Sequence, residues 1–130
     1  PMTGHPNKPL PKNWDNIPGA RGCTPETCSF RDAHDDFITR NAVPIGLSTQ
    51  SVPDIKEMTA RLLIPYDIVS DEHLSFVNQL HLPTFQAEDK VYIKRLTLIV
   101  EKSIIKHFFY PVFPPDLHVK EALQWLDSNR

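Results

Sequence analysis

Prolines and glycines are crowded at the start of this chain, and they limit where regular structure can form. Six of the thirteen prolines and three of the four glycines lie within the first 25 of the 130 residues. Proline lacks a backbone N–H and glycine is unusually free to rotate, so both interrupt helices and strands. Residues 1–22 also lack the apolar repeat of a helix or a strand. We therefore expect an irregular Pro/Gly-rich arm over 1–22, followed by a domain over 23–130.

The overall composition excludes several classes of protein. The formal net charge is −2 and the six histidines are scattered, so no basic face indicates nucleic-acid binding. Neither a membrane-spanning apolar run nor a signal-peptide pattern is visible. Two cysteines cannot form a disulfide framework or a four-cysteine zinc site, and we assign no metal or cofactor. We expect a cytoplasmic monomer or weak homodimer that binds neither nucleic acid nor membranes.

Helical periodicity follows the arm at several places. The first predicted helix covers 24–40, with Thr24 as its cap and Pro25 at the first helical position, where a missing N–H is harmless. A short helix is predicted after 71, with Val77 on its inner face. The other predicted helix starts are the capping-box-like pair Ser51 and Asp54, and the cap Asp116 before the last helix.

Extended segments alternate with these helices. Strands are predicted over 43–48 and 66–71, and a β-hairpin over 91–100 and 103–110, with Glu101 and Lys102 in its turn. Alternation of helices and strands is typical of an α/β protein in which helices cover a sheet. The expected fold class is therefore α/β.

Two cysteines frame the segment in which we expect chemistry, which reads GCTPETCSFRD over 22–32. Cys23 stands where a loop enters the first predicted helix. The unpaired N–H groups and partial positive charge of a helix N-terminus favour a thiolate over a thiol. A thiolate can attack a peroxide and become a sulfenic acid, and a second thiol such as Cys28 can convert that acid into a disulfide.

The spacing alone leaves the relation between the two sulfurs open. If both cysteines lie on the helix, they are roughly 140° apart around its axis, and they cannot meet unless the first turn unwinds. If Cys23 lies just before the cap, the two side chains could approach each other. Two ordinary buried cysteines would fit the same spacing equally well.

Four segments together match one family pattern in order and spacing, from about Gly22 to the C-terminus. They read GCTPETCSFRD, VPIGLSTQSV, IPYDIVSDEH and RLTLIVEKSIIKHFFYPV. The chain resembles the peroxiredoxin Q, or bacterioferritin-comigratory-protein-like, subfamily of the AhpC/TSA (redoxin) family. This resemblance implies a thioredoxin-like three-layer α/β sandwich. It also implies reduction of hydrogen peroxide or organic hydroperoxides, with thioredoxin or a similar dithiol as the reductant.

The resemblance assigns roles to three residues by position. Cys23 corresponds to the peroxidatic cysteine and Cys28 to the resolving one, so an intramolecular disulfide between them is implied. Arg95 opens the late strand at the place of the family's active-site arginine, whose charge would stabilise the thiolate and polarise the peroxide. A salt bridge at the strand edge is the alternative role for Arg95.

The segment before Cys23 departs from the family pattern Pro-x-x-x-(Thr/Ser)-x-x-Cys. Asn16 stands at the position of the proline, and Ala20 at that of the hydroxyl residue that orients the peroxide. One hypothesis is that the activity is weakened or changed. The hypothesis that we prefer treats the arm as an insertion, so that Pro1 is the family proline and Thr3 or Thr24 supplies the hydroxyl.

The insertion hypothesis has a consequence for the sheet. The N-terminal strands of the fold would lie upstream of Pro1, and the sequence given would be truncated. The central strand expected between 43–48 and 95–100 would then be outside this chain. The neighbouring strands would keep unpaired edges, which favour association with other chains.

Two other functions remain open from the sequence. The first is a thiol–disulfide oxidoreductase or redox sensor of the thioredoxin fold without efficient peroxidase activity. Ala20 favours this reading slightly, whereas the absence of a Cys-x-x-Cys pair speaks against it. The second is a binding domain without enzymatic activity that merely retains the two cysteines.

Overall fold

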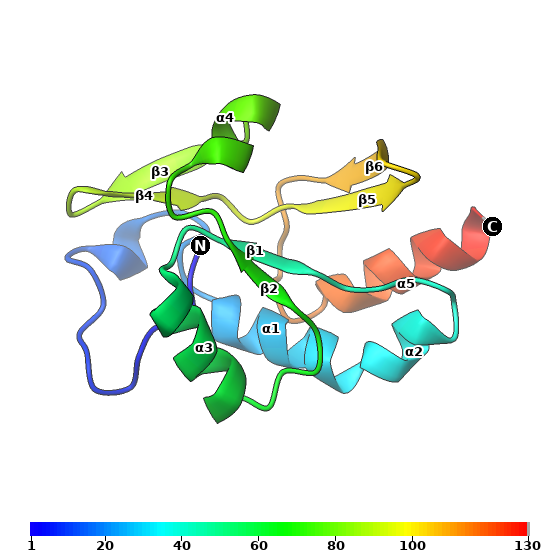
Figure 1. The fold of residues 1–130 in the computed structure, drawn as a ribbon, viewed down its shortest axis with the longest axis horizontal. Helices are drawn as coiled ribbons and strands as arrows, with labels where there is room; N and C mark the ends of the chain where they lie inside the picture. The colour runs from blue at the N-terminus through cyan, green and yellow to red at the C-terminus, as the bar shows by residue number, and fades with distance from the viewer. Residues whose placement is uncertain (130) are drawn as a thin grey trace.

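The computed structural model describes residues 1–129 and has a mixed α/β architecture (Figure 1). Its helical elements are a 3-10 turn, η1 (Trp14–Asn16), and the helices α1 (Cys23–Asp32), α2 (His34–Ile38), α3 (Val52–Arg61), α4 (Ser75–Leu80) and α5 (His118–Ser128). Its strands are β1 (Gly46–Ser48), β2 (Ile68–Ser70), β3 (Thr84–Ala87), β4 (Lys90–Ile93), β5 (Thr97–Glu101) and β6 (Ile104–Phe109). This order confirms the expected α/β class.

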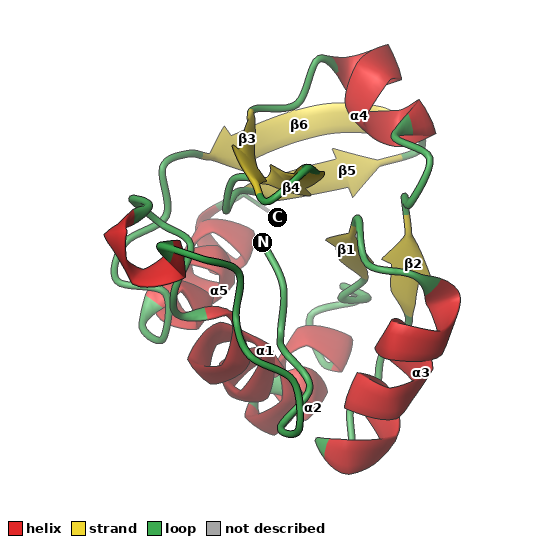
Figure 2. Ribbon diagram, turned by 90° about the vertical axis from the view of Figure 1, so that its left-hand side faces the viewer, coloured by secondary structure: helices red, strands yellow, loops and turns green. Residues whose placement is uncertain are grey.

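The strands form three separate pairs. β1 and β2 are parallel, whereas β3–β4 and β5–β6 are antiparallel hairpins. Within the described residues β1 does not pair with β5. That a central strand of the fold lies upstream of Pro1 stays a prediction. Helix α3 packs against β2, and Figure 2 shows the β1–β2 pair beside α3 and apart from the two hairpins.

Helix α1 is held against two other helices. It contacts α2 and α5, and in Figure 1 these three helices lie on the side of the molecule opposite the hairpins. The Ser29 hydroxyl lies 2.9 Å from the carbonyl oxygen of Pro25 and 3.1 Å from that of Asp116, in the loop before α5. The α1 helix is therefore fixed from the α5 side by a polar contact as well as by packing.

The arm packs onto the β3–β4 hairpin. Its Trp14 and Ala20 are buried in one cluster with Ala87 and Tyr92 of the hairpin, and the Trp14 ring meets Tyr92 edge-on at 5.0 Å between centroids. Tertiary packing thus orders a segment that has no regular periodicity, and it fixes residues 19–21 next to the start of α1. That residues 1–22 are an insertion stays a prediction.

The first helix differs from the prediction for 24–40. It begins at Cys23 with Gly22 as its N-cap, so Thr24 is not the cap and Pro25 is the third helical residue. Gly22 has a φ of 113°, and a Cβ there would lie 2.5 Å from Pro115 Cγ, which explains why a glycine stands at this cap.

The same predicted helix also breaks at Ala33, into α1 and α2. Residues seven apart in a continuous helix lie about 10 Å apart along the axis. The break lets the rings of Phe30 and Phe37 stack with 5.3 Å between centroids, and Phe37 is buried. The break at Ala33 and the stacking of Phe30 on Phe37 thus occur together.

The hairpins also correct the sequence prediction. Residues 91–93 pair with β3 in a hairpin that the prediction missed, because its turn residues Glu88 and Asp89 have positive φ without a glycine signal. Arg95 consequently lies in the bend between β4 and β5 and does not open a strand. The turn of the second hairpin is at Lys102 and Ser103, one residue later than predicted.

At the other predicted helix starts the outcomes differ. Ser51 caps α3, since its hydroxyl accepts a hydrogen bond from the Asp54 N–H, as predicted. Asp116 is not the cap of α5, which begins at His118 after Leu117. Val77 is buried on α4 as expected.

Among residues 1–129, no helix combines the length and apolar character needed to cross a bilayer.

His118 connects α5 to the rest of the domain. It is fully buried, its Nε2 lies 2.8 Å from the Thr97 hydroxyl on β5, and its Nδ1 lies 3.4 Å from Glu121. The ring of Phe109 meets it edge-on at 5.0 Å between centroids. Burial lowers the pKa of His118, although the nearby Glu121 carboxylate acts in the opposite direction.

We predict that acid weakens the fold through His118. An unfolded histidine titrates near its model value of 6.5, above the lowered folded pKa, so the unfolded chain binds more protons in that window. The free energy of unfolding should therefore fall as the pH drops below about 6.5. Urea denaturation at several pH values measures the dependence of the free energy of unfolding on pH. This dependence should be the same for the wild type and for the control His73→Gln, at an exposed position, and weaker for His118→Gln. Equal slopes in all three proteins would contradict this role.

Candidate active site at the start of α1

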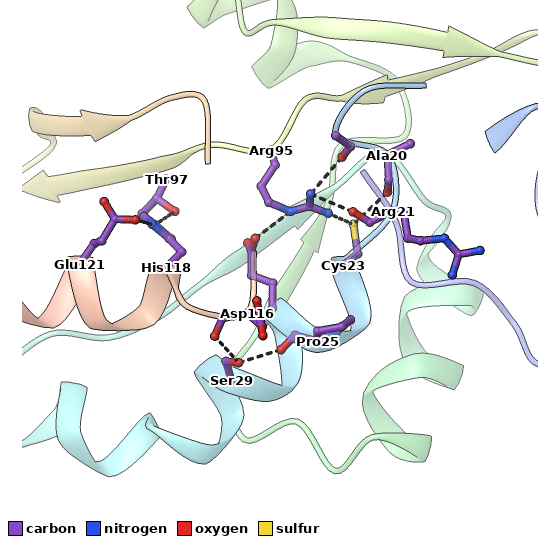
Figure 3. A network of polar contacts seen from close by, with 12 residues as sticks. Ala20, Arg21, Cys23, Pro25, Ser29, Arg95, Thr97, Asp116, His118 and Glu121 are labelled. Atoms are coloured by element: carbon purple, nitrogen blue, oxygen red, sulfur yellow. Dashed lines mark hydrogen bonds and ion pairs between the residues drawn. The ribbon is translucent and has the colours of Figure 1, made fainter. Parts of the chain in front are cut away.

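Cys23 occupies the first position of α1, where the arm enters the helix. Its sulfur lies 2.9 Å from Nη2 of Arg95, and 3.9 Å from the Ala20 carbonyl oxygen, to which a thiol would donate (Figure 3). The side chain is half-buried, so the sulfur is not sealed off from solvent. A cationic donor and a helix N-terminus thus both bring positive charge close to this sulfur.

Arg95 reaches this sulfur from the bend between β4 and β5, and it is buried with 7% of its surface exposed. Its Nη1 donates to the carbonyl oxygens of Gly19 at 2.9 Å and Arg21 at 3.3 Å, and its Nε lies 2.7 Å from Oε2 of Glu26. A guanidinium has five N–H donors. One N–H of Nη2, the nitrogen beside the Cys23 sulfur, is left without a partner among the described residues.

Glu26 holds the other side of the guanidinium. It lies three residues after Cys23 on α1, so both side chains project from the same side of the helix toward Arg95. Burial raises the pKa of the Glu26 carboxyl, whereas Arg95 acts in the opposite direction. Glu26 was not among the predicted site residues, because its partner Arg95 lies about seventy residues away in sequence and no short-range pattern marks the contact.

Cys28 lies in the same helix as Cys23, and both thiols are free. Cys23 is helical, so of the two arrangements that the spacing left open, the structure has the one with both cysteines on the helix. Residues five apart on a helix are about 140° apart around the axis, with Cα atoms roughly 8–9 Å apart. A disulfide bridges Cα atoms less than about 7 Å apart, so these cysteines cannot bond until the backbone moves.

The remaining predicted site residues lie outside the contacts of Arg95. Thr24 is exposed in the first turn of α1, and the structure gives its hydroxyl no hydrogen bond within the described part of the chain. The carbonyl oxygen of Pro1 lies 3.5 Å from the Ser48 hydroxyl. Thr3 is buried, and its carbonyl oxygen accepts a hydrogen bond from Gln50 at 3.0 Å.

No group of three or more potential metal ligands occurs among residues 1–129, counting histidine, cysteine, aspartate and glutamate. The chemically distinctive arrangement in the described chain is therefore a cysteine sulfur, a buried arginine and a half-buried carboxylate. This set can hold a thiolate and offer one N–H donor beside it. It is suited to attack by sulfur on an electrophile that carries an oxygen atom.

The chain is similar to one protein family and to several of its members. The sequence profile of the AhpC/TSA family matches residues 17–108. The chloroplastic peroxiredoxin Q of Arabidopsis thaliana is 28% identical over 110 residues, which cover 82% of this chain and 49% of that protein. The chain thus spans about half the length of the curated relatives it matches.

Solved structures confirm the expected fold. Peroxidoxin BcpB from Mycobacterium tuberculosis superposes with a TM-score of 0.74 and 26% identity, over 88% of this chain and 73% of that chain. Peroxiredoxin Q from Xanthomonas campestris superposes with a TM-score of 0.73 over 93% of this chain and 76% of that one, and at 20% identity this likeness concerns the fold alone. The architecture is therefore the thioredoxin-like fold of peroxiredoxins.

The buried pair of Arg95 and Glu26 generates a stability prediction. Arg95→Met leaves the Glu26 carboxylate half-buried and unpaired, and it should lower the free energy of unfolding by at least about 2 kcal/mol. The loss should grow as the pH rises through the pKa of Glu26, because only the ionised carboxylate needs the arginine. Adding Glu26→Gln should recover part of the loss. Denaturant titrations from pH 4 to 8 measure both effects.

The matched control is Arg40→Met, which removes the 2.8 Å surface pair with Asp127 and should cost about 1 kcal/mol or less. Two results would contradict this prediction. Arg95→Met could lower the free energy of unfolding no more than this control at every pH, or Glu26→Gln could recover none of the loss.

Proposed function

The chain belongs to the AhpC/TSA family, and on that basis we propose that it reduces hydrogen peroxide or organic hydroperoxides with Cys23 as the attacking group. One observation carries this proposal: the Cys23 sulfur lies 2.9 Å from the guanidinium of a buried arginine at a helix N-terminus. The peroxiredoxin relatives support the same reading.

The first step is an attack by sulfur on oxygen. The Cys23 thiolate attacks one peroxide oxygen, the O–O bond breaks, and the second oxygen leaves with a proton as water or an alcohol. Cys23 is oxidised to a sulfenic acid, and the peroxide is reduced by two electrons. In this mechanism the remaining Nη2 N–H of Arg95 donates to the peroxide oxygen on which negative charge develops.

The second step involves Cys28. Its thiol attacks the Cys23 sulfur, the S–O bond breaks, water leaves, and an intramolecular disulfide forms. A dithiol such as thioredoxin then reduces this disulfide and restores both thiols. Since both cysteines lie on α1, this step requires the helix to open between them.

The proposal also takes up two further parts of the sequence prediction. Pro1 and Thr24 remain candidates for the residues that shape the peroxide site, and Thr24 would have to turn its exposed hydroxyl toward the sulfur. A cytoplasmic location also remains a prediction, and the plant relatives are named as chloroplastic proteins.

A thiol–disulfide oxidoreductase is a weaker candidate. Exchange of this kind is typical of a Cys-x-x-Cys pair, whereas four residues separate Cys23 and Cys28 on α1. Arg95 contacts the Cys23 sulfur at 2.9 Å, and Glu26 pairs with Arg95.

Thiol counting after a stoichiometric peroxide pulse tests the proposed function. We predict that the wild type loses both thiols, that Cys28→Ser loses one and becomes reactive toward a sulfenic-acid trap, and that Cys23→Ser loses none. Ellman titration and intact mass spectrometry measure these outcomes. If Cys23→Ser were oxidised as fast as the wild type, or if both wild-type thiols stayed free, the proposed function would be wrong.

A further inference from the structure

The segment over 62–66, between α3 and β2, holds the half of α1 that contains Cys28. The Tyr66 hydroxyl donates a 3.0 Å hydrogen bond to the carbonyl oxygen of Thr27, and Nη1 of Arg31 donates a 2.8 Å bond to the carbonyl oxygen of Leu62. These two contacts tie α1 to a segment that is more than thirty residues away in sequence.

The Tyr66 contact bears directly on Cys28. The Thr27 carbonyl belongs to the peptide bond that joins Thr27 to Cys28. The tyrosine hydroxyl is therefore hydrogen-bonded to the peptide group that must rotate when Cys28 leaves the helix. Tyr66 is itself held in place, because the Gly46 N–H donates a 2.8 Å bond to the neighbouring Asp67 carbonyl and β2 begins one residue later. Burial raises the pKa of Tyr66, so its phenol remains a donor at neutral pH.

We propose that the Tyr66 hydroxyl is a latch on α1 that limits how often Cys28 is released toward Cys23. Tyr66 is thus a positioning residue for the resolving step, and it acts through the Thr27 carbonyl without touching the reacting atoms. This inference rests on the proposed function. The aromatic ring makes its own stacked contact with His34 at 6.3 Å between centroids, so the hydroxyl is separable from the packing of the ring.

The latch sets how long the sulfenic acid survives. A sulfenic acid that is not yet resolved can react with a second peroxide, whose O–O bond breaks while the sulfur becomes a sulfinic acid and water or an alcohol leaves. Slow release of Cys28 therefore favours this side reaction at high peroxide. Faster release favours the disulfide, which a dithiol can reopen.

Tyr66→Phe tests the latch, because it removes one oxygen atom and keeps the ring. The matched control is Tyr110→Phe, which removes the hydroxyl of an exposed tyrosine just after β6. The full chain is mixed with excess hydrogen peroxide, quenched with a thiol-alkylating reagent at set times, and analysed by intact mass spectrometry. This separates sulfenic acid, disulfide and sulfinic acid.

We expect Tyr66→Phe to form the disulfide about 2- to 10-fold faster than the wild type, the range that loss of one neutral hydrogen bond gives. The rate of sulfenic acid formation should not change, and the sulfinic fraction should fall. Tyr110→Phe should match the wild type in all three. If Tyr66→Phe formed the disulfide no faster than the wild type while Cys23 was oxidised normally, the latch would be refuted and the proposed function would stand.

If peroxide oxidised Cys23 in none of the proteins, the proposed function would fail, and diamide would still test the latch. One thiolate adds to the diamide N=N bond, the second thiol displaces it, and a disulfide and a hydrazine result. Tyr66→Phe should again form the disulfide faster than both the wild type and Tyr110→Phe. Equal rates in this assay would also refute the latch.

Discussion

The buried guanidinium of Arg95 is the contact on which the site depends. It joins the end of the arm through the carbonyl oxygens of Gly19 and Arg21, and the first turn of α1 through Cys23 and Glu26. Arg95 itself comes from the bend between two hairpins. One planar cation therefore joins an irregular segment, a helix and a loop between hairpins. It can contact all of them at once because its N–H donors point in fixed, different directions.

The α1 helix has two opposing roles in this account. Its N-terminus and the nearby arginine bring positive charge to the Cys23 sulfur, which suits the proposed attack on a peroxide. The same intact helix keeps Cys28 away from Cys23. It is held by the hydrogen bond from Tyr66 to a helix carbonyl and by the one from Ser29 to the loop before α5. Reactivity toward peroxide and formation of the disulfide therefore need different states of one helix, and the stability of α1 sets the balance between them.

Local patterns predicted the elements well where one short-range signal decides the structure. The Ser51 cap, the buried Val77 and the α/β order belong to this class. The predictions failed where tertiary contacts decide. The break at Ala33 accompanies the stacking of Phe30 on Phe37, and the β3–β4 hairpin turns at two residues with positive φ that are not glycines. No periodicity in the sequence carries either signal.

The candidate site was predictable in part. Cys23 and Arg95 were assigned together because of the family resemblance, and the structure places their side chains in contact. The partnership of Glu26 with Arg95 was missed, because it depends on a guanidinium that arrives from about seventy residues away. The hydrogen bond from Tyr66 to Thr27 was missed for the same reason, since its acceptor is a backbone carbonyl that no sequence pattern marks.

The central claim is that the Arg95 guanidinium makes the Cys23 sulfur reactive, and one rate constant tests it most directly. Oxidation of Cys23 by hydrogen peroxide is measured by stopped flow in a Cys28→Ser background, with and without Arg95→Lys. Lysine keeps the positive charge but cannot make the forked contacts, so the account predicts a rate constant at least about tenfold lower. An unchanged rate constant would contradict the account, because the geometry around the guanidinium would then be unnecessary.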